Sequence, residues 1–281
     1  MNVTEYLQKW SVSYRDDMLG NIMPFWLKHG LDLRNGGVYT CLDRDGSLID
    51  TTKSVWFQGR FAFTCSYAYN HIEQNPEWLA AAKSTIDFIE QHCFDSDGRM
   101  FFEVTASGEP LRKRRYVFSE TFAAIAMAEY AIASGEREYA EKALKLFKDI
   151  QRFLNTPGVL EPKYWNTVQS KGHSIVMILI NTASRIRAAI ADPALDKQID
   201  DSIALLQKDF MHPEFNALLE TVGSNGEFID TINGRIINPG HCIETSWFIL
   251  EEAKYRNWDK QLTDMALTIL DWSWEWGWDK E

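Results

Sequence analysis

The chain has 281 residues, of which 45% are hydrophobic and 25% are charged, so its composition is that of an ordinary globular protein rather than a disordered or collagen-like chain. Its 29 basic and 40 acidic residues give a net charge of −11, which argues against nucleic acid and anionic membranes as partners. No apolar run is long enough to cross a bilayer, the first residues lack a signal-peptide core, and the four cysteines are scattered. We therefore expect a cytoplasmic protein.

Helical periodicity dominates the chain and predicts nine helices. In chain order the predicted helices cover residues 2–29, 53–74, 76–92, 118–134, 137–154, 171–191, 193–211, 241–256 and 259–276.

Two classes of helix alternate after the first. The second, fourth, sixth and eighth helices are apolar nearly all round, so they should be buried. The third, fifth, seventh and ninth carry a charged stripe, so they should face water. The links from a buried helix to an exposed one are short, whereas the links from an exposed helix to a buried one are long. This alternation is the pattern of a long helical-hairpin repeat.

The long links are the expected place for function. Two of them contain hairpin patterns, at residues 38–42 before Asp45-Gly46 and at residues 101–105 before Ser107-Gly108. In an α/α toroid, all the long loops emerge at one end of the ring, above the first turns of the buried helices. Loops on a rigid scaffold are where binding and catalytic residues concentrate.

Polar residues stand at the start of three buried helices. Lys53, Gln58 and Arg60 would be costly to bury without polar partners, and the Arg60 guanidinium suits hydroxyls, an oxyanion or a structural carboxylate. Glu120 either favours the positive end of its helix or contacts a substrate. His173 begins the sixth helix and is either a core residue or a functional one.

The strongest candidate site lies at residues 238–247. A Pro-Gly turn places His241 at the start of a helix, and Glu244 and Trp247 follow it three and six residues later, on one face. A neighbouring carboxylate tunes the pKa of a histidine near neutrality, as proton transfer requires. Tryptophan offers a platform for a sugar ring. A metal site would need ligands besides His241 and Glu244, so we expect no metal.

Four segments, at residues 36–46, 53–60, 118–120 and 238–247, together resemble the N-acylglucosamine 2-epimerase family, which includes the cellobiose 2-epimerases. The resemblance implies an all-α (α/α)6 toroid or barrel with short β-hairpin loops at one end. It also implies a single α/α-barrel domain over residues 1–281 that lacks the C-terminal part of the family, with nine of twelve helices. We expect such a chain to be weakly active or inactive alone.

The resemblance further implies an isomerase that interconverts N-acetylglucosamine and N-acetylmannosamine by deprotonation and reprotonation at C2 through an enediolate. His241 matches one of two acid/base histidines, and Glu244 would orient it and set its pKa. Arg60 matches an arginine that stabilises the charge developing on a substrate oxygen. His173 matches a histidine of the cellobiose branch with a plausible role in ring opening.

The expected substrate contacts are Trp247, Trp56, Gln58, Lys53, Glu120 and Tyr39. The resemblance implies no metal or redox cofactor. Some family members respond to ATP as an effector, but this sequence has no nucleotide-binding motif. The expected partner is a small-molecule sugar, and a homodimer is the family-based expectation.

Other functions remain open from the sequence. A cellobiose or mannobiose 2-epimerase and an aldose–ketose sugar isomerase share the enediolate chemistry. An (α/α)6 glycoside hydrolase would use two carboxylic acids, and Glu120 and Glu244 could take those roles. A non-catalytic carbohydrate-binding module is the remaining alternative.

Overall fold

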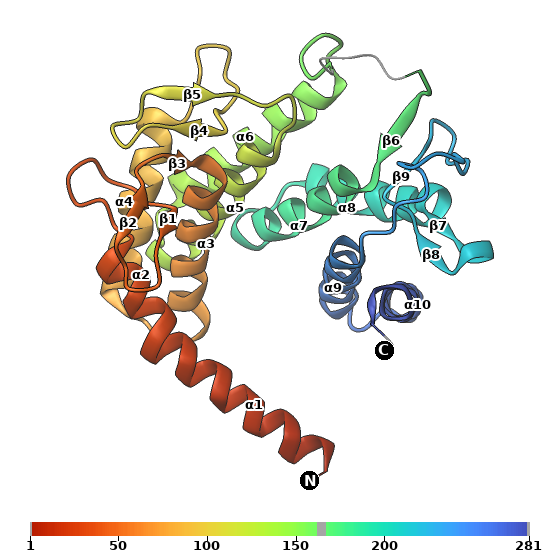
Figure 1. Ribbon diagram of the computed structural model, residues 1–281, viewed down its shortest axis with the longest axis horizontal. Helices are drawn as coiled ribbons and strands as arrows, with labels where there is room; N and C mark the ends of the chain where they lie inside the picture. Colours follow the sequence, from red (N-terminus) through yellow and green to blue (C-terminus); the bar gives the residue numbers. More distant parts are fainter. Residues whose placement is uncertain (1, 162–166, 280–281) are drawn as a thin grey trace. The chain divides into compact units, whose positions relative to one another are not determined.

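The computed structural model describes residues 2–161 and 167–279, and it is dominated by helices with short strands in the loops (Figure 1). Residues 162–166, in the predicted loop between the fifth and sixth helices, lie outside the described part. The chain divides into two compact units, Met1–Leu160 and Glu161–Glu281. The expected single domain over residues 1–281 stays a prediction. Within the described ranges, no helix combines the length and apolar character that a membrane span needs.

Nine continuous helical segments are present in the described residues, as the sequence predicts. The first joins α1, a π-helical turn η1 and α2, and the seventh continues from α8 into η2. The first unit contains α1 (Val3–Asp17), η1 (Met18–Ile22), α2 (Met23–His29), α3 (Val55–His71), α4 (Pro76–His92), α5 (Phe118–Ser134) and α6 (Arg137–Asn155). The second contains α7 (His173–Ala189), α8 (Pro193–Leu205), η2 (Leu206–Phe210), α9 (Pro239–Tyr255) and α10 (Lys260–Gly277).

Local capping explains where several of these helices begin. Asn75, Asp192 and Asn238 precede α4, α8 and α9, and the side chain of each accepts a hydrogen bond from a backbone N–H in the first turn. A proline follows each cap, where its fixed φ suits a helix and its missing N–H costs nothing. Gly135 ends α5 with a φ of +76°.

Short antiparallel strands occupy the long loops. The first unit has β1 (Cys41–Leu42), β2 (Leu48–Asp50), β3 (Lys53–Ser54), β4 (Glu103–Val104) and β5 (Pro110–Arg112), in which β1 pairs with β2 and β4 pairs with both β3 and β5. Both predicted hairpins are confirmed. The second unit has β6 (Ser170–Gly172), β7 (Met211–His212), a 3-10 turn η3 (Pro213–Phe215), β8 (Ala217–Leu218) and β9 (Thr221–Gly223).

Two predicted helix starts are wrong, because the residues concerned pair as strands. The sequence predicts helices from residues 53 and 171, but α3 and α7 each begin two residues later. The residues just before them belong instead to β3 and β6, whose backbone groups pair with β4 and β9. Each strand leads directly into a helix, so the loop fixes the position of the first helical turn.

The core of the first unit forms around α5, which packs against both α3 and α6. Every residue of α5 from Ser119 to Ala131 is buried. The backbones of α3 and α5 approach closely at Gly59, where an added Cβ would lie 2.7 Å from the backbone of Phe122. In the second unit, α7 packs against α8, and α9 packs against α10.

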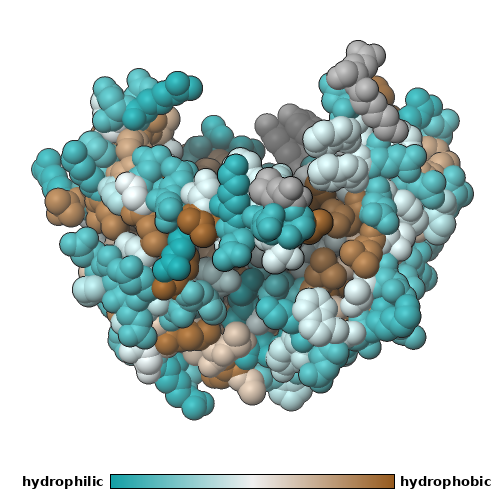
Figure 2. Space-filling model, turned by 90° about the horizontal axis from the view of Figure 1, so that it is seen from below, coloured by the Kyte–Doolittle hydropathy of each residue, from teal (hydrophilic) through white to brown (hydrophobic). Residues whose placement is uncertain are grey.

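The predicted burial of the apolar helices holds for α5 but is incomplete for α3 and α9. Phe57 on α3 is 51% exposed and Trp247 on α9 is 49% exposed. Hydrophobic residues thus reach the surface among hydrophilic ones, as the face seen in Figure 2 also shows. One side of each of these two helices is therefore accessible to a ligand or to other protein atoms.

Candidate functional site

The first turns of α7 and α9 meet at a loop residue, Glu220, within the second unit. His173 is the first residue of α7, and its backbone N–H donates to the Glu220 carbonyl oxygen at 3.0 Å. The antiparallel pairing of β6 with β9 holds this loop beside α7. His241 lies in the first turn of α9, where the capping oxygen of Asn238 accepts its backbone N–H at 3.3 Å. Strand pairing and a helix cap thus bring the side chains of His173, Glu220 and His241 together.

The Glu220 carboxylate lies between the two imidazole rings. Its two oxygens are 3.1 and 3.0 Å from His241 Nδ1. One of them is 3.6 Å from His173 Nδ1, and the ring centroids of the histidines are 6.3 Å apart. His173 is completely buried, whereas the side chain of His241 is 35% exposed. Of the two histidines, His241 is therefore the one that a ligand can reach.

Glu220 and His241 each shift the pKa of the other toward the charged form. Burial opposes ionisation of Glu220, but its electrostatic interactions with His173 and His241 outweigh burial and lower its pKa to about 2. The hydrogen bond to Glu220 raises the pKa of His241, burial opposes this increase, and the charges of Glu220 and Glu244 add to it. Glu220 is therefore ionised at neutral pH and accepts the proton on His241 Nδ1, which leaves His241 Nε2 to take up or release a proton.

The same three side chains offer a donor set suited to a transition metal. One ligand atom from each of His173, Glu220 and His241 lies within 4.8 Å of the others. Imidazole nitrogens and a carboxylate are ligands that zinc and related ions accept. The arrangement thus offers either proton transfer or metal coordination.

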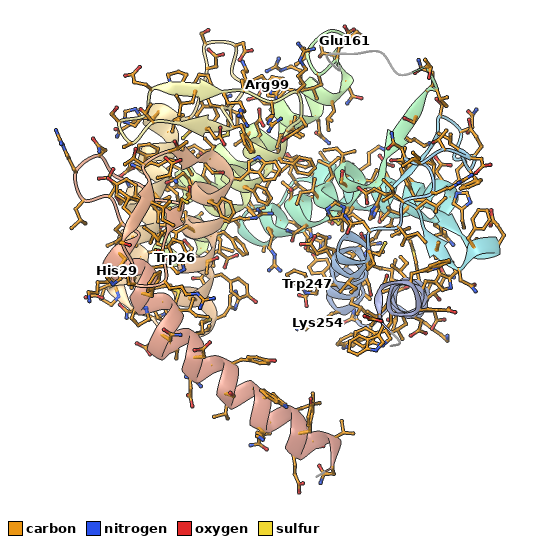
Figure 3. The ribbon with its side chains drawn as sticks, in the orientation of Figure 1. Trp26, His29, Arg99, Glu161, Trp247 and Lys254 are labelled. Atoms are coloured by element: carbon orange, nitrogen blue, oxygen red, sulfur yellow. The ribbon has the colours of Figure 1, made fainter. Side chains whose placement is uncertain are left out.

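The structure assigns the orienting contact of His241 to Glu220 rather than to the predicted Glu244. Glu244 is exposed and influences His241 through its charge. Glu220 carries one recognisable signal, because it is the charged residue within a mainly apolar stretch, residues 217–222. Trp247 projects from α9 and packs beside Phe248, with ring centroids 5.1 Å apart (Figure 3). The Trp247 side chain is thus partly exposed.

Arg60, Trp56 and Tyr39 lie in the first unit. The Arg60 guanidinium is 4.0 Å from the ring centroid of Phe122 and 5.7 Å from that of Trp56. Trp56 belongs to an aromatic cluster, in which its ring contacts Phe102, Tyr116, Phe118 and Phe122. Arg60 and Tyr39 both line a cavity of about 360 Å³, whose other walls are mainly apolar. Arg60 and Tyr39 thus border accessible space, whereas Trp56 packs within the aromatic cluster.

The predicted substrate contacts of Lys53, Gln58 and Glu120 are corrected, because all three side chains are completely buried. The Lys53 ammonium donates to the Asp32 carboxylate at 2.8 Å and to two backbone carbonyls. Gln58 accepts from the backbone N–H of Val38 and donates to its carbonyl.

Glu120 accepts hydrogen bonds from Arg99 Nε at 2.6 Å and from the backbone N–H of Met100 at 3.0 Å. Arg99 comes from the long loop between α4 and α5 (Figure 3). Lys53, Gln58 and Glu120 therefore hold the loops of the first unit onto its helices through buried hydrogen bonds.

Comparison with known proteins identifies the family. The model of the N-acylglucosamine 2-epimerase family matches residues 37–281. The N-acylglucosamine 2-epimerase of Bos taurus is 30% identical over 94% of the chain, and the cellobiose 2-epimerase of Dictyoglomus turgidum is 24% identical over 87% of it. The match covers 64% of the bovine protein and 66% of the Dictyoglomus protein.

A solved structure has a similar fold. The cellobiose 2-epimerase of Bacillus thermoamylovorans superposes with a TM-score of 0.84 and 21% identity, over 96% of this chain and 73% of that one. The likeness confirms the predicted (α/α)6 fold class. With the family match over most of its length, the chain belongs to the N-acylglucosamine 2-epimerase family.

Proposed function

We propose that the protein interconverts N-acetylglucosamine and N-acetylmannosamine by inverting C2, and that it is thus a carbohydrate isomerase. The observation that carries this proposal is the contact of His241 Nδ1 with the ionised Glu220, which leaves Nε2 of a partly exposed ring free for proton transfer. The substrate is taken from the bovine relative, which is named an N-acylglucosamine 2-epimerase.

The proposed reaction begins with opening of the sugar ring, because a carbonyl at C1 makes the C2 proton acidic. The resemblance gives this step to His173, but the His173 side chain is completely buried, so we assign it no direct contact with the sugar. His241 Nε2 then accepts the C2 proton, and the Glu220 carboxylate stabilises the imidazolium that forms. From the resemblance we assign stabilisation of the enediolate oxygen to Arg60, and we expect Trp247 to support the apolar face of the sugar. Return of a proton to the opposite face of C2 completes the inversion.

Deuterium exchange at C2 tests the proposal. For the 281-residue chain alone we expect slow exchange of the C2 hydrogen of N-acetylglucosamine for deuterium in D2O. We also expect weak net inversion of C2, because inversion needs a proton donor on each face of the enediolate. His241→Gln removes the base and should lower exchange by about 100-fold or more. His71→Gln is the matched control, since the side chain of His71 is 52% exposed and lies in the other unit. Exchange that survives His241→Gln would contradict the proposed base.

We also propose that the reaction requires no metal or redox cofactor. Removal of a proton beside a carbonyl needs a base and a group that stabilises negative charge, and His241 and Arg60 are proposed to supply them. Dialysis against a chelator should leave the C2 exchange rate unchanged. Loss of exchange that zinc restores would instead assign the cluster of His173, Glu220 and His241 to a catalytic metal. ATP as an effector stays an expectation of the resemblance.

A cellobiose 2-epimerase is the second candidate, because the Dictyoglomus relative carries that name. Parallel assays with cellobiose and N-acetylglucosamine separate the two substrates. An aldose–ketose isomerase would differ by forming a ketose from the same enediolate. We further propose that the protein is a cytoplasmic homodimer. We also propose that it binds neither nucleic acid nor membranes, and the acidic net charge supports this second proposal. Light scattering on the purified chain tests the dimer.

A further inference from the structure

The hydrogen bonds of Thr245 determine which nitrogen of His173 carries a proton. Thr245 Oγ1 donates to the carbonyl oxygen of His241, one helical turn earlier, at 2.8 Å. A hydroxyl has one hydrogen, so this bond uses it. Thr245 Oγ1 also lies 2.8 Å from His173 Nε2 and can only accept there. His173 must therefore donate from Nε2 to the threonine oxygen.

The other nitrogen of His173 is left without a partner. His173 Nδ1 is completely buried and makes no hydrogen bond to any of the described residues. It faces a Glu220 oxygen at 3.6 Å, too far for a hydrogen bond. A buried polar atom without a partner is costly, and native proteins rarely keep one without a functional reason. The Nδ1 lone pair thus lies beside a carboxylate, where a proton would be held by both groups.

The charged and aromatic surroundings of His173 come from three elements. The loop before β9 supplies Glu220, α9 supplies His241 with the charge of Glu244 beyond it, and η2 supplies the ring of Phe210, whose centroid is 5.9 Å away. Asp209 of η2 is engaged by Lys171. Among these groups, Glu220 is the anion that contacts both rings.

We propose that Thr245 and Glu220 are positioning residues that impose opposite tautomers on the two histidines, so that His173 carries its proton on Nε2 and His241 carries its proton on Nδ1. This inference rests on the proposed function.

Nitrogen NMR of the histidine rings tests this assignment without any substrate. The 281-residue chain, labelled with 15N in its six histidines, should show His173 protonated at Nε2 and His241 protonated at Nδ1. His173→Gln and His241→Gln assign the two sets of signals. Thr245→Val keeps the shape of the side chain but removes the acceptor, so His173 should switch to the Nδ1–H form and donate to Glu220. Thr245→Ser keeps the hydroxyl and should retain the original tautomer.

Three outcomes would overturn the proposal: His173 protonated at Nδ1 in the unaltered chain, no tautomer switch in Thr245→Val, or a switch in Thr245→Ser. If Thr245→Val does not fold, the nitrogen spectra of the unaltered chain and of Thr245→Ser still test the tautomer assignment. Correct tautomers in a chain without C2 exchange would refute only the proposed function. Where exchange is measurable, Thr245→Val should lower its rate about ten-fold with the half-saturating sugar concentration unchanged. A purely structural defect would change both.

Discussion

At the scale of single residues, the contact between His241 and Glu220 links the proposed chemistry to stability. Glu220 has a pKa lowered from 4.5 to about 2, so its contribution to stability is present above pH 4.5 and is lost as the pH falls toward 2. His241 has a pKa raised above 6.5, so its contribution is present below pH 6.5 and is lost as the pH rises through the folded-state pKa. Both contributions are complete only between these limits.

Glu220→Gln should therefore lower the free energy of unfolding most between pH 4.5 and 6.5. We expect a loss of about 2 kcal/mol there, as for other hydrogen bonds between charged groups, and a smaller loss on either side. Denaturant unfolding of both chains across this pH range measures the difference. Glu244→Gln is the control, since Glu244 is exposed and acts on His241 only by charge. A difference that does not vary with pH would contradict the ionic contact.

The sequence could predict His241 but not its partner, and the reason is distance along the chain. Helical spacing relates His241 to residues three and four positions away, which is why Glu244 is the partner that the sequence suggests. The observed partner, Glu220, lies 21 residues earlier, in a loop that strand pairing fixes. For a similar reason, the buried partners of Lys53 are unpredictable, since Asp32 and the Ala106 carbonyl come from two separate loops.

At the scale of elements, the helices were the predictable part of the fold, because each carries its own periodicity and often its own cap. α4 and α5 have the predicted boundaries, Pro76–His92 and Phe118–Ser134. The starts of α3 and α7 are predicted too early, because the residues before each helix pair with strands distant in sequence. The start of α9 is predicted two residues too late, because Pro239 and Gly240 belong to its first turn. The close approach of α3 to α5 is also a tertiary property, which a glycine in the sequence indicates only in retrospect.

Gly59→Ala tests this approach. The new Cβ would lie 2.7 Å from the Phe122 backbone, which cannot move aside as the end of a flexible side chain can. The helices must separate, and we expect the free energy of unfolding to fall by about 1–3 kcal/mol. Gly20→Ala is the matched control in η1, where nothing lies within 4 Å of the new Cβ. It should raise the free energy by about 0.5–1 kcal/mol, since alanine favours a helix. Equal effects of the two substitutions would argue against tight packing at Gly59.

At the scale of the whole molecule, the net charge of −11 should give neutral and anionic substrates different reaction rates. A field of this sign repels anions at long range and leaves a neutral sugar unaffected. Salt screens such a field, so the rate of C2 exchange for N-acetylglucosamine should change by less than about two-fold between low and high ionic strength. Its 6-phosphate should react more slowly at low salt and faster as salt is added. Faster reaction of the phosphate at low salt would contradict the assignment of a neutral sugar as substrate.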